Sequence, residues 1–366
     1  MKAEKGPHPE VVHAALVVAQ LAFGGGAVVG KFGVHGTNPV LFAFIREAVA
    51  GPILCVLAFL KTGRALPGRV DYARVALAGV AIFSNQLFFI MGLKLADAVA
   101  ASAWQPSQPL MTLTLAVALG QEHFTVRKVA GLGVAVFGAL VLVAGKAATA
   151  KSNGSSSSMQ LAGHCSLFIN CMSTSVYVLA SKALLARNYD SISVTGWSYL
   201  VGSVCMFVAV VSINSTPSLL RFVCSAAGEE AIETKCVEGA WDVPASMFWP
   251  LLYWIFVASI GAYYMMTWAN KHAKWASGVS AYTVLQPVAS GSLSALLVVL
   301  KGKEWAASYG FSLPSISDLC GVLGIFSGLA LLFSESDASA SSGESSAVQK
   351  LPGMAGSSDD NYIAMA

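Results

Sequence analysis

The stretch ASAWQPSQPLMTLTLAVALG, residues 101–120, places two prolines and two glutamines inside an otherwise apolar run. Gln105-Pro106 opens this polar insertion and Gln108-Pro109 closes it. A proline inside a helix removes one backbone N–H and displaces the carbonyl four residues earlier. Freed carbonyls and amide side chains are costly in apolar surroundings. What the insertion is for therefore depends on what the whole chain is.

The composition predicts a helical membrane protein. Of the 366 residues, 55% are hydrophobic and only 11% are charged, whereas soluble domains carry about 25% charged residues. Apolar runs of roughly 20 residues, the length of a helix that crosses a bilayer, recur along the chain. These runs do not alternate between apolar and polar residues as the strands of a membrane β-barrel do. We therefore predict an all-α, polytopic membrane protein.

The runs predict about ten transmembrane helices, five on each side of a Ser-rich linker at 146–159. The N-terminus, 1–10, is short and mixed in charge, and it resembles neither a signal peptide nor a transit peptide. Residues 335–366, rich in Ser, Gly, Ala and acids, predict a disordered cytoplasmic tail. The expected spans are roughly 11–31, 39–60, 73–94, 98–119, 126–145, 160–182, 193–213, 247–270, 277–300 and 316–334.

The charge distribution favours cytoplasmic termini. The termini and the even-numbered loops hold 13 Lys and Arg, and the odd-numbered loops hold 8; cytoplasmic loops carry the excess of such residues. The densest cluster, KTGRALPGRVDYAR at 61–74, lies on the expected inner side. The net charge of +3 is then a topology signal and not a sign of nucleic-acid binding. Either the plasma membrane or an endomembrane fits this pattern.

The long loop at 214–246 has features of a non-cytoplasmic segment. Both sequons of the chain, at Asn153 and Asn214, fall in odd-numbered loops. The loop also holds Cys224 and Cys236, which either form a disulfide in an oxidising space or stay as two free thiols. The other five cysteines lie in spans without metal-ligand spacing and are interpreted as small packing residues.

An internal repeat covers the opening stretch. GLKLADAVAASAWQPSQP, 92–109, lies over NKHAKWASGVSAYTVLQP, 270–287, without a gap and with a shift of 178 residues. The two Gln-Pro pairs then coincide, and Trp104 matches another aromatic residue, Tyr282. The chain therefore uses the same polar insertion twice.

The repeat extends to both sides of this stretch. GLGVAVFGALVLV, 131–143, matches the glycines of GVLGIFSGLALLF, 321–333, at a shift of 190, and Lys31 and Lys182 end the first and sixth spans. The chain is thus a five-span unit used twice, over 11–145 and 160–334. An odd number of spans turns the second copy upside down in the membrane, which is the inverted-repeat topology typical of secondary transporters.

The prolines fall near the middle of spans four and nine. They release the backbone carbonyls of Ser102, Gln105 and Thr283 from helical hydrogen bonds. Such carbonyls are tolerated at this depth where they face protein or a wet cavity. Proline in a membrane helix can equally serve packing alone. The matched positions of Pro109 and Pro287 favour two kinked helices that face each other across a central substrate path.

The side chains beside the prolines are the first candidates for substrate binding. Gln108 and Gln286 can donate and accept hydrogen bonds at the same depth as the kinks. Trp104 and Tyr282 stand one helical turn away and could flank a planar or apolar substrate. We expect these four residues, with Pro109 and Pro287, to line the path.

Further polar residues within the spans complete the candidate site. Arg46 could hold an anionic group, or it could be structural; Glu47 next to it points about 100° away around the helix, so we expect no simple neutralisation. Asn85, Asn170 and Tyr177 could form hydrogen bonds with a substrate, or they could form hydrogen bonds that hold helices together. His164 could be a protonatable relay, although its position near the start of a span favours an interfacial role.

The ten-span layout resembles the drug/metabolite transporter superfamily of the EamA type. The resemblance rests on ADAVAASAWQPSQP at 96–109, on Glu122 thirteen residues after Pro109, and on the glycine-rich span that follows. QLAFGGGAVVGKFGVHGTNPVLFAFIREAVAGP, 20–52, is similar to the first two spans of the plant nodulin-like branch. The second half departs from the pattern, because Glu304 follows Pro287 by seventeen residues. The resemblance implies export or exchange of small polar metabolites, with proton coupling as an option.

Other classes of function find little support in the sequence. It has no His-Glu-x-x-His pair, no Gly-x-Ser-x-Gly turn and no Walker loop, so we expect no enzyme, no metal and no cofactor. A membrane-embedded receptor, or an enzyme without a recognisable motif, is the alternative. The expected partners are a small-molecule substrate and the lipid bilayer, without nucleic acid, and both a monomer and a homodimer are compatible with the sequence.

Overall fold

The computed structural model describes residues 7–34, 37–95, 101, 104–147, 157–224, 230–308 and 319–332. Within these ranges every regular element is helical, which agrees with the predicted all-α class. The N-terminal residues 1–6, part of the predicted linker and the predicted tail lie outside them. The helices are α1 (Pro9–Val34), α2 (Pro39–Thr62), α3 (Tyr72–Leu95), α5 (Gln108–Ala118), α6 (Val126–Ala147), α7 (Ser157–Leu185), α8 (Ser191–Asn214), α9 (Pro217–Cys224), α10 (Glu230–Glu238), α11 (Phe248–Leu252), α12 (Tyr263–His272), α13 (Ala276–Ala281), α14 (Gln286–Lys301), α15 (Lys303–Ser308) and an unlabelled helix at Leu319–Leu332.

Seven stretches of helix in this part of the chain are long and apolar enough to cross a membrane. They overlap seven of the ten expected spans. The other three expected spans fall on α5, on α6 and on the helix at Leu319–Leu332, which are not among the seven. The seven stretches are Pro9–Gly30, Pro39–Thr62, Arg69–Leu93, Leu161–Leu185, Ser191–Asn214, Ala245–His272 and Ala276–Lys301.

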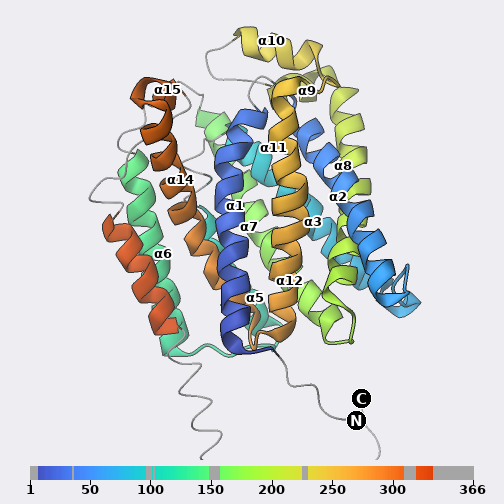
Figure 1. Cartoon of the computed structure of the whole chain (residues 1–366), viewed down its shortest axis with the longest axis vertical. Coiled ribbons are helices and arrows are strands. Elements are labelled where there is room, and N and C mark those ends of the chain that lie inside the picture. The colour runs from blue at the N-terminus through green and yellow to red at the C-terminus, as the bar shows by residue number, and fades with distance from the viewer. Residues whose placement is uncertain are drawn as a thin grey trace, which may run out of the picture.

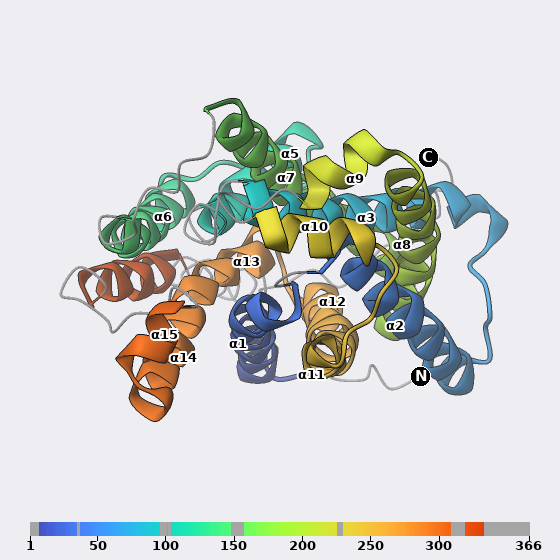
Figure 2. The same ribbon diagram turned by 90° about the horizontal axis from the view of Figure 1, so that it is seen from above.

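The long helices run side by side as a bundle (Figure 1). α9 and α10 lie across one end of the bundle, which we call the disulfide end, and α7 begins there. α1 begins at the opposite end. Seen from above, α6 and the helix at 319–332 stand together at one side, whereas α2 and α8 stand at the other (Figure 2).

The ends of α2 follow from local sequence signals. The Asn38 side chain accepts hydrogen bonds from the backbone N–H groups of Val40 and Leu41, and Pro39 occupies the first helical position. Gly63 ends the helix with φ +68°, and its N–H donates to the carbonyl of Phe59. Only glycine adopts this left-handed conformation without cost, so the Gly63 position defines the stop.

Both Gln-Pro pairs break their spans, as the sequence predicts. A 3-10 turn at Gln105–Ser107 precedes α5, and a second one at Tyr282–Leu285 joins α13 to α14. In each turn the Gln of the Gln-Pro pair donates its backbone N–H three residues back, to the carbonyl of Gln105 or of Thr283. The tighter turns therefore re-satisfy two of the three carbonyls that the prolines were expected to release; Ser102 lies outside the described residues.

The glycine-rich spans five and ten pack directly against each other. A Cβ atom on Gly328 would lie 2.3 Å from the backbone nitrogen of Ala135, and one on Gly138 would lie 2.6 Å from that of Ile325. A Cβ on Gly131 would lie 3.0 Å from the carbonyl oxygen of Gly328. Side chains cannot fit at this distance, so the glycines allow backbone to meet backbone, as small residues do between membrane helices.

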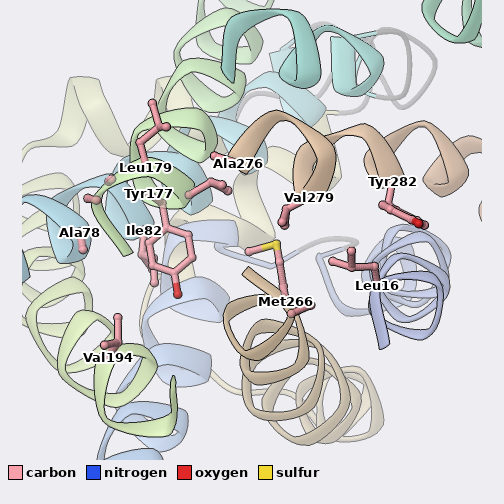
Figure 3. Packing of buried hydrophobic residues seen from close by; sticks show 14 of the residues in the cluster. Leu16, Ala78, Ile82, Tyr177, Leu179, Val194, Met266, Ala276, Val279 and Tyr282 are labelled. Carbon is pink, nitrogen blue, oxygen red and sulfur yellow. The ribbon is translucent and has the colours of Figure 1, made fainter. Parts of the chain in front are cut away.

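The apolar core joins helices from both halves of the chain. Figure 3 shows Tyr177 of α7 next to Ile82 of α3, and Met266 of α12 pointing toward Val279 of α13. Tyr177 and Ile82 are each 1% exposed, and Val279 is fully buried. Tight packing of this kind fixes the positions of the polar side chains that lie between the apolar ones.

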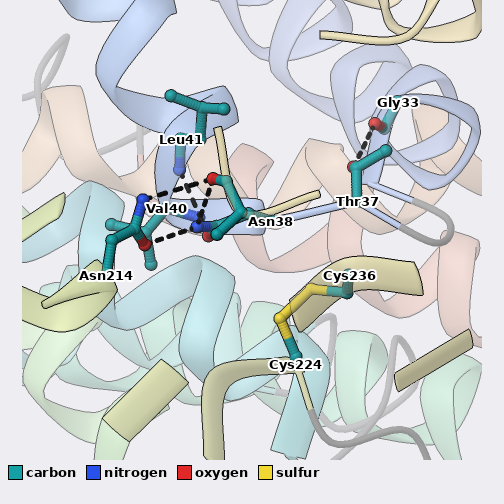
Figure 4. The surroundings of a disulfide bond; sticks show 9 residues. Gly33, Thr37, Asn38, Val40, Leu41, Asn214, Cys224 and Cys236 are labelled. Carbon is teal, nitrogen blue, oxygen red and sulfur yellow. Dashed lines mark hydrogen bonds between the residues drawn. A yellow bond between two sulfur atoms is a disulfide. The ribbon is translucent and has the colours of Figure 1, made fainter. Parts of the chain in front are cut away.

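The long loop folds into two short helices that cover the disulfide end. Cys224 at the end of α9 and Cys236 in α10 form a disulfide, so the first of the two expected alternatives applies (Figure 4). The Asn38 side chain donates to Asn214 at 2.8 Å and to the carbonyl of Ala240 at 3.1 Å. The N-terminal cap of α2 thus also anchors both ends of the loop.

Candidate functional site

A chain of amide side chains crosses from the first broken helix to α7 and α3. Gln108 donates to the side-chain oxygen of Gln105, and Gln105 donates to Asn170 at 3.1 Å. Asn170 in turn donates to the backbone carbonyl of Asn85 at 2.8 Å. Gln105, Gln108 and Asn170 are buried. The structure therefore brings three of the predicted site residues, Gln108, Asn170 and Asn85, into one hydrogen-bonded group.

Asn85 connects this group to a cluster of aromatic residues. Its side chain donates to Thr174 and accepts a hydrogen bond from the hydroxyl of Tyr263 at 2.8 Å. The Tyr263 ring packs edge-on against Tyr177, with 5.9 Å between ring centroids, and the Tyr177 hydroxyl lies 2.8 Å from that of Thr267. Amides that both donate and accept, next to aromatic faces, are the composition of many small-molecule sites.

The sequence positions these groups through helical periodicity. Asn170, Thr174 and Tyr177 occupy positions i, i+4 and i+7 of α7, so they lie along one face. Tyr263 and Thr267 are four residues apart on α12 and share a face in the same way. We call the group formed by Asn85, Gln105, Gln108, Asn170, Thr174, Tyr177, Tyr263 and Thr267 the central polar cluster.

Contacts across the two breaks connect α5 with α13. The Thr112 hydroxyl lies 2.9 Å from that of Ser280, and it also donates to Ser175 of α7 at 2.9 Å. Thr283 donates its hydroxyl to the carbonyl of Gln105 at 3.4 Å. The carbonyl that Pro109 was expected to expose therefore faces the second break, and not lipid.

The second Gln-Pro pair lies against α1. Gln286 donates to the side-chain oxygen of Gln20 at 2.7 Å. Gly24, one turn along α1, faces the backbone of Gln286, and a Cβ there would lie 2.7 Å from its carbonyl oxygen. Pro109 and Pro287 are both buried. Gln108 and Gln286 thus contact different helices, α7 and α1, on the two sides of the crossing.

Trp104 and Tyr282, which we expected to flank a substrate, contact different helices, α7 and α1. Trp104 is half-buried and donates its indole N–H to His164 at 3.1 Å. Tyr282 is 5% exposed and its hydroxyl is hydrogen-bonded to His13 of α1, beside Leu16 (Figure 3). Their partners, His164 and His13, lie near the starts of α7 and α1, and these two helices begin at opposite ends of the bundle (Figure 1).

Arg46 has a different surrounding from the one expected. Its guanidinium lies 3.9 Å from the Glu47 carboxylate and 4.7 Å above the ring of Trp254. The two long side chains thus bend toward each other although their Cβ atoms diverge, and both are buried. Both carboxylate oxygens of Glu47, and Nε and Nη2 of Arg46, are buried without a hydrogen-bond partner in the described part of the chain.

Tyr263 is the main residue that the sequence did not assign to the site. It is hydrogen-bonded to Asn85, and its ring packs against that of Tyr199 with 5.3 Å between the ring centroids. A π-helical segment, Tyr253–Ala262, ends directly before it. Such segments are often found at functional sites, but nothing in the local sequence announces this one.

Glu122, which carries part of the family resemblance, joins the two halves at the opposite end from the disulfide. Its carboxylate accepts the backbone N–H of Ser277 at 3.0 Å and lies 3.1 Å from the Lys128 ammonium. Lys128 also stands 4.1 Å above the ring of Trp275. Glu122 is 5% exposed and Lys128 3% exposed, so this is a buried ion pair. No group of three His, Cys, Asp or Glu in the described ranges could hold a metal ion.

A comparison with known families finds a match in the N-terminal part of the chain. Residues 12–144 match the EamA-like transporter family. The chain carries an EamA-like transporter domain. This domain contains α1, α2, α3, α5 and most of α6, and therefore the first broken helix and Glu122. Together with the apolar helices of the fold, it makes the chain an integral, multi-pass membrane protein.

Two curated proteins resemble the EamA-like chain. A WAT1-related protein of Arabidopsis thaliana is 24% identical over 219 residues, which are 55% of this chain and 60% of that protein. An uncharacterized transporter of Archaeoglobus fulgidus is 26% identical over 199 residues, 52% of this chain and 64% of that protein. The chain thus matches less than two thirds of the length of either relative.

The whole bundle also resembles a solved crystal structure. The two chains superpose with a TM-score of 0.61 over 89% of this chain and 96% of the other, at 17% sequence identity. At that identity the likeness concerns the fold and carries no information on substrate. The shared fold covers almost the entire chain.

Proposed function

We propose that this protein is a secondary transporter of small organic solutes, built from two inverted five-span repeats and working by alternating access. The single observation that supports the inversion most strongly is the reciprocity of contacts between positions that the sequence repeat matches. Two copies related by a two-fold axis must make every cross-copy contact twice, with the roles exchanged.

The glycine contact is reciprocal in this sense. The shift of 190 matches Ala135 with Ile325 and Gly138 with Gly328. Gly328 lies against Ala135, and Gly138 lies against Ile325. Each contact is the image of the other, as expected where spans five and ten cross at the axis.

The broken helices follow the same rule. The shift of 151 that matches Lys31 with Lys182 also matches Gly24 with Ser175. Gly24 lies against the carbonyl of Gln286, and Ser175 donates to the carbonyl of Gln108 at 3.3 Å. Gln105 and Thr283, which match at a shift of 178, contact each other directly. A residue that touches its own counterpart lies beside the axis.

The central polar cluster is the proposed substrate path. Gln108, Asn85, Asn170 and Tyr177 would contact the substrate from one side of the crossing and Gln286 from the other, while Arg46 would hold an anionic group. Pro109 and Pro287 would keep the helices broken, so that amides and carbonyls become available at mid-depth. Because alternating access needs contacts that exchange, amides with several partners within reach suit this role.

The disulfide supports the proposed orientation. Disulfides persist in oxidising spaces and are rare in the cytosol. The disulfide end would therefore be the outer end, and both termini would be cytoplasmic, as the Lys and Arg counts predict. Plasma membrane and endomembrane placements both agree with this arrangement.

Uptake into proteoliposomes tests the function. The purified full chain is reconstituted, and pooled labelled metabolites are supplied with and without an imposed pH gradient. Saturable uptake of one pool, lost in the Gln108→Ala variant, supports the proposal, and enhancement by the gradient would assign proton coupling. No uptake by folded protein from any pool would contradict it and favour a receptor role.

A further inference from the structure

The two repeats carry a matched pair of histidine contacts at the two ends of the bundle. The shift of 151 that matches Lys31 with Lys182 also matches His13 with His164, and the shift of 178 matches Tyr282 with Trp104. His13 is hydrogen-bonded to Tyr282, and His164 to Trp104. Each pair joins a broken helix of one repeat to the first helix of the other repeat, so the two contacts are again images of each other.

The pairs occupy the positions that gates would have. His13 lies near the start of α1, at the opposite end from the disulfide, whereas His164 lies near the start of α7, at the disulfide end (Figure 1). Trp104 and Tyr282 are each four residues from the glutamine of a Gln-Pro pair. Each ring thus stands between the central crossing and one end of the bundle.

The two pairs differ in their hydrogen-bond chemistry. The indole of Trp104 is a donor only, so the His164 ring nitrogen that faces it must carry a free lone pair. Protonation puts a hydrogen on both ring nitrogens of an imidazole and removes that acceptor. A tyrosine hydroxyl both donates and accepts, so the pair of Tyr282 with His13 survives either charge state. Only the Trp104 pair is incompatible with protonation.

Among the described residues, none forms an ion pair with His164. The His164 side chain is exposed. The titratable neighbour on its own helix is Cys165. α3 packs against this part of α7, where Gly92 faces the carbonyl of Gly163.

We propose that His164 is a proton-binding residue that holds Trp104 closed when neutral and releases it when protonated, so that acid on the disulfide side opens that end of the path. The inference rests on the proposed transport function for its meaning as a gate. Histidine is the side chain that most often serves as a pH switch in proteins. The matched pair at the other end would not respond, which makes the gating asymmetric.

A buried native thiol can report the opening without any knowledge of the substrate. Cys171 is fully buried and its thiol donates to the backbone carbonyl of Trp104 at 3.3 Å. Departure of Trp104 would expose it to a membrane-impermeant thiol reagent from the disulfide side. A reporter chain keeps Cys171 and the disulfide and has alanine at Cys55, Cys165, Cys205 and Cys320. A reference chain keeps the disulfide and the exposed Cys320 and has alanine at Cys171 and at the other free cysteines.

The experiment compares labelling of full-length reporter in proteoliposomes at about pH 7.5 and about pH 5.5, two values on either side of the usual histidine range. Rates are divided by those of the Cys320 reference, which removes the effect of pH on the reagent. We expect a roughly tenfold rise at acid pH, the factor that corresponds to the loss of one hydrogen bond of ordinary strength. The rise should reverse on return to pH 7.5, which separates opening from unfolding.

Three variants of the reporter test the mechanism. His164→Asn keeps an acceptor for the indole but cannot be protonated, and labelling should stay low at both pH values. Trp104→Phe lacks the indole donor, and labelling should be high at both. His13→Asn is the matched control and should respond to pH as the unmodified reporter does. A reporter that does not respond to pH, or a response that persists in His164→Asn, overturns the proposal. Labelling of Cys171 needs only folded protein. A lack of transport would therefore contradict the proposed function but would not change the outcome of the labelling experiment.

Discussion

Two crossings between the first and the second half of the chain are opposite in chemistry. At one crossing, α6 meets the helix at 319–332 through glycines, with backbone against backbone. At the other, the broken helices meet through hydroxyls and amides, such as Thr112 with Ser280. A glycine contact has one geometry, because any slide brings atoms into collision. Hydroxyls and amides can exchange partners at little cost, because each can both donate and accept.

Under the proposed transport mechanism, this difference suggests that the two crossings have different roles. The glycine crossing would hold the two repeats together as a fixed pivot, and the polar crossing would rearrange during transport. Substitutions at the first crossing should then affect folding, and substitutions at the second should affect transport. The predictions below test this separation, beginning with the largest expected effect.

Filling the glycine crossing should prevent folding. In Gly328→Leu the new side chain would start 2.3 Å from the backbone of Ala135, and in Gly138→Leu 2.6 Å from that of Ile325. Overpacking against backbone should cost about 3 kcal/mol or more. The measurement is the yield of monodisperse protein after detergent extraction. Gly133→Leu is the control, since nothing lies within 4 Å of a Cβ at that position. A normal yield of Gly328→Leu would show that the glycine crossing is not a rigid contact.

Removing the charge of Glu122 should destabilise the opposite end from the disulfide. Glu122→Gln leaves the ammonium of Lys128, 3% exposed, without its counter-charge. Breaking one partner of a buried pair typically costs about 3–5 kcal/mol. Thermal unfolding in detergent measures the loss. The double variant Glu122→Gln with Lys128→Met should recover part of it, and a single variant as stable as the wild type would show that the pair contributes nothing.

Removing either glutamine should lower transport without lowering yield. Gln108→Ala and Gln286→Ala each delete an amide that bonds a neighbouring amide, Gln105 or Gln20. Loss of one such hydrogen bond in the moving crossing should reduce initial uptake roughly tenfold. Gln121→Ala, at an exposed position after α5, is the control and should transport normally. Wild-type uptake rates in both variants would show that the two glutamines do not contact the substrate.

The contact between Thr112 and Ser280 should have the smallest effect. A double-mutant cycle of Thr112→Val and Ser280→Ala, measured by unfolding in detergent, gives the coupling free energy between the two hydroxyls. We expect this coupling to be about 1 kcal/mol. Thr114→Val is the matched control, because the Thr114 hydroxyl bonds only within its own helix, to the carbonyl of Leu110. A coupling as large as the cost of filling the glycine crossing would mean that both crossings are equally rigid.

The sequence predicts the breaks well because their cause is local. Pro109 and Pro287 act on the carbonyls a few residues before them, and a matched glutamine precedes each, so the repeat and both interruptions follow from the chain alone. The disulfide could be named as an alternative on the same basis, because Cys224 and Cys236 lie in one loop.

The partners of each side chain could not be predicted in this way. Trp104 and Tyr282 match in sequence, but which helix each ring meets depends on how the second repeat is turned in space. The Cβ atoms of Arg46 and Glu47 point in different directions around the helix, but their charged groups still approach to 3.9 Å. Tyr263 follows a π-helical segment, whose extra residues per turn rotate the helix face away from the α-helical period.

The bonding of Asn214 has a consequence for the order in which the protein is made. Asn214 begins a sequon, but in the folded chain its amide donates to the carbonyl of Ala240 at 3.2 Å and its oxygen accepts from Asn38. A sugar on that nitrogen would have to be attached before the loop closes over the end of α2. The presence of a glycan on Asn214 would therefore mean that glycosylation of the loop precedes its folding, and its absence would fit the reverse order.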